Sequence, residues 1–262
     1  MTQAPSECLA WSSPEIEAGR ALFRSPVLLG GPAARAGLSC HACHSNGHVN
    51  QSFLLPELTD RAGAADVTSE WASRVRGDGV VNPVDIPDLV DVARRESFGR
   101  AHDPSLEHFT RSVIVEEFQG EPPSDAAFAS VIAYLRALDS AHCPAGEQRI
   151  TMASAADDVR RALAAASVAD AATASLLVFA AQDGVGRIVE RLPARRFGRD
   201  RRTFERLSRE LGAIRSANNV PAALETALPG WSARFDAAVT RSARRERRTY
   251  FNQTMLRAAL ED

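Results

Sequence analysis

The sequence contains no lysine, so all 31 of its basic residues are arginine. This absence excludes a ring of lysines as a surface for docking to an acidic partner. Methionine and cysteine are also scarce, with three Met and four Cys in 262 residues. The rest of the composition is ordinary: 45% of the residues are apolar and 24% are charged, which is enough to bury a core.

Long apolar runs are absent as well. The most apolar stretch lies near Leu176–Ala181 and is far too short to cross a bilayer. The first residues, Met1-Thr-Gln-Ala-Pro5, lead directly into polar sequence without the apolar segment of a signal peptide. We therefore expect no transmembrane segment and no leader within the chain as numbered.

The charge is unevenly divided along the chain. Residues 1–150 carry 12 Arg against 20 Asp and Glu, whereas residues 151–262 carry 19 Arg against 13 acids. The turn-forming stretch Pro144-Ala-Gly146 lies where the charge changes sign. This pattern predicts two domains, an acidic one over residues 1–148 and a basic one over residues 149–262. Because the net charge is only -2, we do not expect nucleic-acid binding.

Helical spacing and capping residues dominate both halves, and no strand pattern of any length is present, so we predict an all-α fold. In the first half, the expected helices cover residues 14–24, 67–76, 87–93, 105–115 and 124–139. In the second half, they cover residues 154–166, 170–182, 185–191, 202–216, 220–227 and 231–260, with breaks at Gly184 and Pro229.

The most specific pattern in the chain is Cys40-His41-Ala-Cys43-His44, which fits C-x-x-C-H. Two thiols at this spacing add to the two vinyl groups of one porphyrin, and the following histidine becomes the proximal iron ligand. The pattern predicts one covalently bound haem c, with His41 facing solvent. A zinc site formed with His48 is the alternative, which we disfavour because no second Cys/His pair has finger spacing.

Thioether attachment of haem normally occurs outside the cytoplasm, so we expect a periplasmic or secreted protein that has lost its leader. The two remaining cysteines, Cys8 and Cys143, bracket the predicted haem module. In an oxidising compartment we expect them to form a disulfide. Across so long a loop, the chain-entropy model assigns this bond about 4–5 kcal/mol.

Several short segments, in order, resemble one haem domain of the bacterial di-haem cytochrome c peroxidase family. They begin at Gly19, Gly37, Ile86, Ser105 and Ala133, and the resemblance covers about residues 14–140. It implies a cytochrome c-like domain whose N-terminal helix, with Gly19 and Phe23, crosses a C-terminal helix that carries Tyr134 and Leu135. The second half resembles no family, and the chain has one haem motif where the family has two.

The family's electron-transfer domains use methionine as the second axial ligand, yet no methionine lies between Cys43 and Tyr134. Four possibilities therefore remain for the distal side of the iron. Met152 could fold back, a histidine could bind, the second half could supply Met255, or the site could be open. The candidate histidines are His102, His108 and His48. In an open site, Glu116 or Glu117 would act as acid/base, as a glutamate does in the family's peroxidatic domain.

Two further groups of arginines have a possible role. Arg74 and Arg76 lie in a region near Trp71 that could meet the haem propionates through charge-assisted hydrogen bonds. The basic runs over residues 195–202 and 241–248 are either solvated helix faces or docking sites for an acidic partner.

Three functions follow from these patterns. The first is an electron carrier that serves a redox partner protein. The second is a peroxidase-like enzyme with an open iron, and the third is a sensor or assembly subunit whose basic domain is the working part. The distal ligand separates the first two, because a strong-field ligand gives low-spin iron that is inert to peroxide. Oligomeric state is left open by the sequence.

Overall fold

The computed structural model describes residues 2–261, which divide into two compact units. The N-terminal unit comprises residues 5–146, and the C-terminal unit comprises residues 147–261 together with residues 2–4. The division falls two residues before the expected one. The first residues group with the C-terminal unit because strand β1 (Gln3–Pro5) pairs with β6 (Glu147–Arg149). The described residues are mostly helical, and their strands are only two or three residues long.

The N-terminal unit consists of short helices joined by long irregular segments. Its α-helices are α1 (Pro14–Phe23), α2 (Gly31–Arg35), α3 (Cys40–Cys43), α4 (Leu106–Ser112) and α5 (Asp125–Ala137). Its other helical turns are η1 (Pro26–Leu28), η2 (Val92–Arg94), the π-helix η3 (Val113–Glu117) and η4 (Ser140–His142). Two antiparallel pairs complete it: β2 (His44–Ser45) with β3 (His48–Val49), and β4 (Ala64–Ala65) with β5 (Val84–Asp85).

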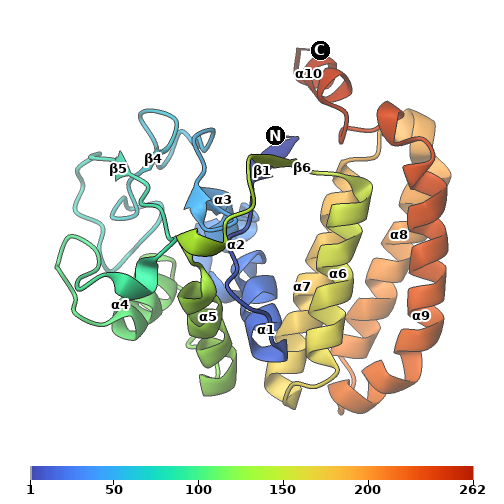
Figure 1. Ribbon diagram of the computed structural model, residues 1–262, viewed down its shortest axis with the longest axis horizontal. Helices are drawn as coiled ribbons and strands as arrows, with labels where there is room; N and C mark the ends of the chain where they lie inside the picture. Colours follow the sequence, from blue (N-terminus) through green and yellow to red (C-terminus); the bar gives the residue numbers. More distant parts are fainter. Residues whose placement is uncertain (1, 262) are drawn as a thin grey trace. The chain divides into compact units, whose positions relative to one another are not determined.

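Helices α1 and α5 pack against each other and form the frame of this unit (Figure 1). Gly19 allows the close approach, because a Cβ at this position would lie 1.8 Å from the carbonyl oxygen of Ser130. Beside this contact, the rings of Phe23 and Tyr134 lie 5.2 Å apart, centre to centre. The expected crossing of the two helices through a small residue and aromatics is confirmed.

The helix expected over residues 67–76 is not formed. The Asp66 carboxylate instead accepts hydrogen bonds from the backbone N–H groups of Thr68 and Asn82, each at 3.0 Å. Because an Asp side chain that bonds two residues ahead stabilises a turn, this segment folds as turns and bends. The helix expected over residues 87–93 is also wrong: only the single turn η2 forms, after Asp91 adopts a left-handed backbone conformation (φ 60°).

The C-terminal unit is built from long helices: α6 (Met152–Ala166), α7 (Ala171–Glu190), α8 (Ala194–Arg215), α9 (Val220–Ala243), the turn η5 (Glu246–Arg248) and α10 (Gln253–Glu261). Helices α6 to α9 lie side by side (Figure 1) around a core that includes Phe204, Trp231 and Phe235. The Trp231 indole donates a hydrogen bond to the Leu207 carbonyl at 3.0 Å. Among the described residues, no helix is long and apolar enough to cross a membrane.

Two expected helix breaks in this unit are wrong. Gly184 lies inside α7, where a Cβ would come within 2.8 Å of Val159 on α6, so the glycine serves helix packing rather than termination. Pro229 lies inside α9, between the buried residues Leu224 and Trp231. Packing on both sides of the proline keeps the helix continuous, against its local preference to break.

Candidate functional site

The C-x-x-C-H motif forms its own short element. Helix α3 begins at Cys40 and ends at Cys43, so a single turn carries both thiols. Both cysteines are free and half-buried. Cys43 packs against a small group of buried apolar side chains, here called the apolar cluster: Phe53, Leu58, Ala65, Ala72 and Ile86. The second thiol of the motif therefore faces an apolar wall.

Partly exposed apolar side chains pack on this buried cluster. Among them are Leu38, Val49, Leu55, Trp71 and Phe118. They come from segments on both sides of the motif, including the residue that follows η3. Apolar side chains from distant segments thus gather on the cluster that Cys43 contacts and remain partly exposed.

His44 follows the last residue of α3, and a hydrogen bond to another segment holds its ring in place. Its Nδ1 lies 2.9 Å from the Pro87 carbonyl oxygen, and since a carbonyl only accepts, Nδ1 carries the hydrogen. Burial lowers the pKa of His44 to about 4, although the Pro87 hydrogen bond acts in the opposite direction. The imidazole is therefore neutral near pH 7, with the Nε2 lone pair available. Metal-binding histidines use this arrangement, in which the second ring nitrogen donates to a carbonyl.

Burial also raises the pKa of the Cys40 thiol to about 11 and that of Cys43 to about 12. Neither is therefore a thiolate near pH 7, which disfavours a cysteine nucleophile. The zinc alternative is not supported either. That alternative requires His48, which lies instead beside Cys8 and Cys143, two cysteines that are joined in a disulfide and therefore offer no thiolate.

A buried polar network centred on Glu7 reaches the motif. The Glu7 carboxylate accepts hydrogen bonds from Arg20 Nε (2.7 Å), Arg24 Nη2 (3.0 Å) and the Tyr134 hydroxyl (2.7 Å). Burial alone would raise the pKa of Glu7, but the charges of Arg24 and Arg20 outweigh it and hold the pKa well below its usual range. The network therefore contains an ionised carboxylate inside the unit.

Arg24 carries this network to the motif itself. One of its nitrogens lies 3.3 Å from Nδ1 of His41, and another bonds the side chain of Asn46. The expectation that His41 faces solvent is wrong, because its ring also accepts from the Asn46 backbone N–H at 3.2 Å. No sequence pattern singles out Glu7, Arg24 or Asn46 as part of this network; only the turn-forming pair Asn46-Gly47 carries a local signal.

The disulfide between Cys8 and Cys143 is present, as the sequence predicts. His48 Nε2 lies 3.3 Å from the Cys8 sulfur, and its Nδ1 lies 3.0 Å from an Asp88 carboxylate oxygen. Both ring nitrogens of His48 are thus engaged, one by the disulfide sulfur and one by Asp88. Asp88 follows Pro87 directly, so the disulfide corner and the His44 hydrogen bond share one segment.

Arg76 binds both candidate acid/base residues at the end of η3. Its guanidinium lies 2.8 Å from Glu116 Oε2 and 2.5 Å from Glu117 Oε1, while Arg74 is exposed. The Arg76 hydrogen bond lowers the pKa of the half-exposed Glu116. Burial raises the pKa of Glu117, although the Arg76 charge opposes this effect. The pKa values of the two adjacent carboxyl groups are therefore shifted in opposite directions. The Arg76 side chain binds both of them and is not left free for another partner.

The other candidate distal ligands lie in varied surroundings. His102 is exposed, and His108 is exposed and bonded to Asp103. Met152 is fully buried at the start of α6, where its backbone N–H donates to Glu246 at 2.8 Å. Met152 and Met255 belong to the C-terminal unit. Ligation of the iron by any of these residues stays a prediction.

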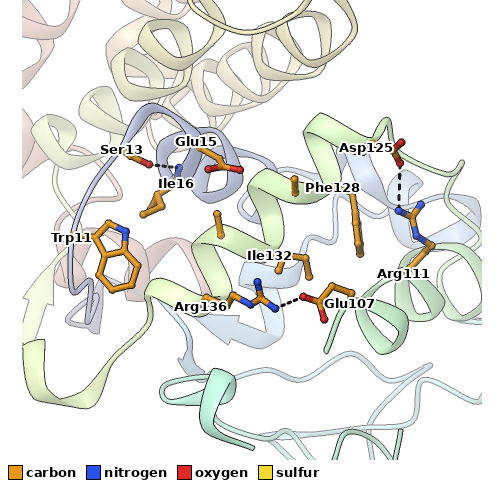
Figure 2. A pocket seen from close by; sticks show the side chains of 12 residues that line it. Trp11, Ser13, Glu15, Ile16, Glu107, Arg111, Asp125, Phe128, Ile132 and Arg136 are labelled. Carbon is orange, nitrogen blue, oxygen red and sulfur yellow. Dashed lines mark hydrogen bonds and ion pairs between the residues drawn. The ribbon is translucent and has the colours of Figure 1, made fainter. Parts of the chain in front are cut away.

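A surface groove of about 570 Å³ lies along α1 and α5 in the same unit (Figure 2). Trp11 lies at one end of it, and Arg111 stacks over Phe128 at the other, with 4.1 Å from the guanidinium carbon to the ring centre. Its charged side chains are largely paired, as between Arg136 and Glu107. Glu15 also lines the groove, so it holds one carboxylate outside these pairs.

Comparison of the chain with protein-family models, curated proteins and solved structures finds no match. The function must therefore be argued from the site itself.

Proposed function

We propose that the protein carries one covalently bound haem c and transfers single electrons to a redox partner protein in the periplasm or outside the cell. The observation that carries the proposal is the hydrogen bond between His44 Nδ1 and the Pro87 carbonyl. It orients the histidine of a C-x-x-C-H motif with Nε2 free, which is the form that binds iron.

The residues present fit this group. Cys40 and Cys43 are free thiols on one helical turn and would hold the haem through two thioether bonds. His44 would be the proximal ligand. The partly exposed apolar side chains that pack on the cluster at Cys43 are of the kind that pack against a porphyrin. When bound, the haem supplies a one-electron redox centre, which no side chain provides.

The rest of the chain positions these three residues. The Pro87 carbonyl fixes the tautomer and rotation of His44, and the contacts of Arg24 and Asn46 with His41 anchor the middle of the motif. The apolar cluster excludes water from the side of Cys43. Such a preformed site needs little rearrangement between oxidation states, which suits electron transfer.

A peroxidase-like activity is the second candidate, and Glu117 is the observation that favours it. Its side chain is only 7% exposed, and burial raises its pKa. A general acid/base is most effective when its pKa lies near the working pH. The next residue, Phe118, packs on the apolar cluster that Cys43 also contacts. Glu117 is therefore a better candidate acid/base than the half-exposed Glu116.

Haem attachment is tested on protein produced in a cell that matures c-type cytochromes. We expect the haem to stay with the polypeptide in acid acetone and the mass to exceed that of the chain by one haem. Cys40→Ala with Cys43→Ala should abolish attachment. Cys8→Ser with Cys143→Ser is the matched control and should retain the haem, because attachment is read under denaturing conditions. A colourless wild-type protein would refute the proposal.

Paramagnetic resonance of the ferric protein separates the two candidates. Low-spin iron that does not react with peroxide supports electron transfer, and Met152→Ala and His102→Ala then test the sixth ligand. High-spin iron that reacts with peroxide supports the enzyme. In that case Glu117→Gln should slow the reaction by roughly 10²–10⁴-fold, whereas Glu116→Gln should have little effect.

A further inference from the structure

The two basic runs of the sequence meet in the C-terminal unit. Arg196 and Phe197 from the start of α8 line a pocket of about 520 Å³ together with Arg245 and Arg248, which follow α9. The lining residues of the two runs are at least 48 positions apart in the sequence, and the fold brings them to one place. Three of the four lining residues are arginines, so the pocket is strongly positive.

One wall of the pocket is fixed by a buried ion cluster. The Asp200 carboxylate, only 4% exposed, binds Arg241 Nε at 2.7 Å and Arg245 Nη2 at 2.6 Å. The Arg245 guanidinium also lies over the Phe197 ring, 4.3 Å from its centre. One carboxylate shared by two guanidinium groups leaves a net positive charge, and Arg245 is held in place by both contacts.

The other two arginines are exposed and free to bind. Within residues 2–261, the side chains of Arg196 and Arg248 have no hydrogen bond or ion pair. Glu246, the acidic residue nearest to Arg248 in the sequence, accepts a hydrogen bond from the Met152 backbone N–H at 2.8 Å. The pocket thus presents two unpaired guanidinium groups beside a positioned one.

The start of α8 brings like charges together. Pro193 precedes the helix and offers no capping side chain, and Arg195 and Arg196 stand in a first turn that contains no acidic residue. The backbone of Phe197 is not helical, so a kink separates this turn from the rest of α8. A bound anion would offset the repulsion between the arginines.

We propose that this pocket binds a small, multiply charged oxyanion, carried either by a phosphate ester or by a polycarboxylate. Guanidinium groups chelate both kinds of oxyanion through paired, charge-assisted hydrogen bonds. The pocket has the size of a small-molecule site, which spans about 300–1,000 Å³. The inference does not depend on haem attachment.

Calorimetric titration of the full holoprotein with pyrophosphate, and separately with citrate, at about 0.15 M salt tests the proposal. We expect one saturable site for at least one of them, and the arm that binds identifies the oxyanion class. Arg196→Gln with Arg248→Gln should weaken binding by more than about tenfold. Arg206→Gln with Arg209→Gln removes the same charge from two exposed arginines of the same helix and should change nothing.

Equal weakening in both double variants would show a diffuse ion atmosphere and overturn the proposal. Absence of saturable binding by either anion would overturn it as well. Binding of a poly-glutamate peptide when neither small anion binds would replace it with an acidic protein partner. Circular dichroism of each variant shows whether the helices are intact before the titrations are compared.

Discussion

The two units of this protein are stabilised in different ways. The C-terminal unit consists of four long helices around a core of buried apolar side chains. The N-terminal unit has short helices and long turns, and every described residue with a positive φ belongs to it. It is closed by the disulfide between Cys8 and Cys143 and braced by the ion network around Glu7.

This difference shows what the proposed haem site requires of the fold. Turns place two thiols, an imidazole and a carbonyl within one small region, which regular helices alone do not do. We therefore expect covalent and polar ties to contribute a larger share of stability in this unit. If so, removing one of these ties should destabilise the N-terminal unit and leave the C-terminal unit unchanged.

Removal of the disulfide should have the largest effect. Cys8→Ser with Cys143→Ser opens a loop of 135 residues, for which the chain-entropy model gives about 4–5 kcal/mol of unfolding free energy. Hydrogen exchange read by mass spectrometry should show faster exchange across residues 5–146 and no change across the α6–α9 helices. Equal acceleration in both units would show that they unfold as one.

Glu7→Gln should have the next largest effect and lower the free energy of unfolding by about 3–5 kcal/mol, because it leaves Arg20 and Arg24 buried without their carboxylate. The matched control is Asp236→Asn in the C-terminal unit, which breaks a half-exposed ion pair with Arg160 and should cost less than about 1 kcal/mol. Urea unfolding of both variants measures the difference. Similar losses of unfolding free energy in the two variants would show that the buried Glu7 network contributes no more than a half-exposed ion pair.

The pH dependence of stability should report the same carboxylate. Because the pKa of Glu7 is lower in the folded than in the unfolded chain, its contribution is present above the unfolded value of about 4.3. It is lost as the pH falls below that value. We expect the stability difference between wild type and Glu7→Gln to shrink as urea midpoints are measured from neutral pH down to acid. A constant difference would argue against an ionised Glu7.

Glycine substitutions should give the smallest effects and differ in sign. Gly19→Ala places a Cβ against the Ser130 backbone and should cost about 1–3 kcal/mol or more. Gly184→Ala meets only the end of a Val159 side chain and should cost less. Gly186→Ala in the same helix α7 meets nothing within 4 Å and should stabilise by about 0.5–1 kcal/mol. Thermal unfolding ranks the three variants, and equal effects would contradict this ranking.

Features that depend on neighbours in the chain were predictable from the sequence. The motif spacing alone places Cys40, Cys43 and His44 together, because one helical turn spans them. The caps Ser13 and Ser124 mark the starts of α1 and α5, since each side chain accepts from a backbone N–H of the first turn. The charge difference between the halves likewise indicated two units close to their observed division.

Contacts between distant residues were decided only by the tertiary structure. The Pro87 carbonyl lies 43 residues from His44, and Glu7 and Tyr134, which bond directly, are separated by 127. No local pattern encodes such pairs, because burial and charge compensation select them after the chain has folded. The same reason explains why α9 continues through Pro229, where packing outweighs the local preference of one residue.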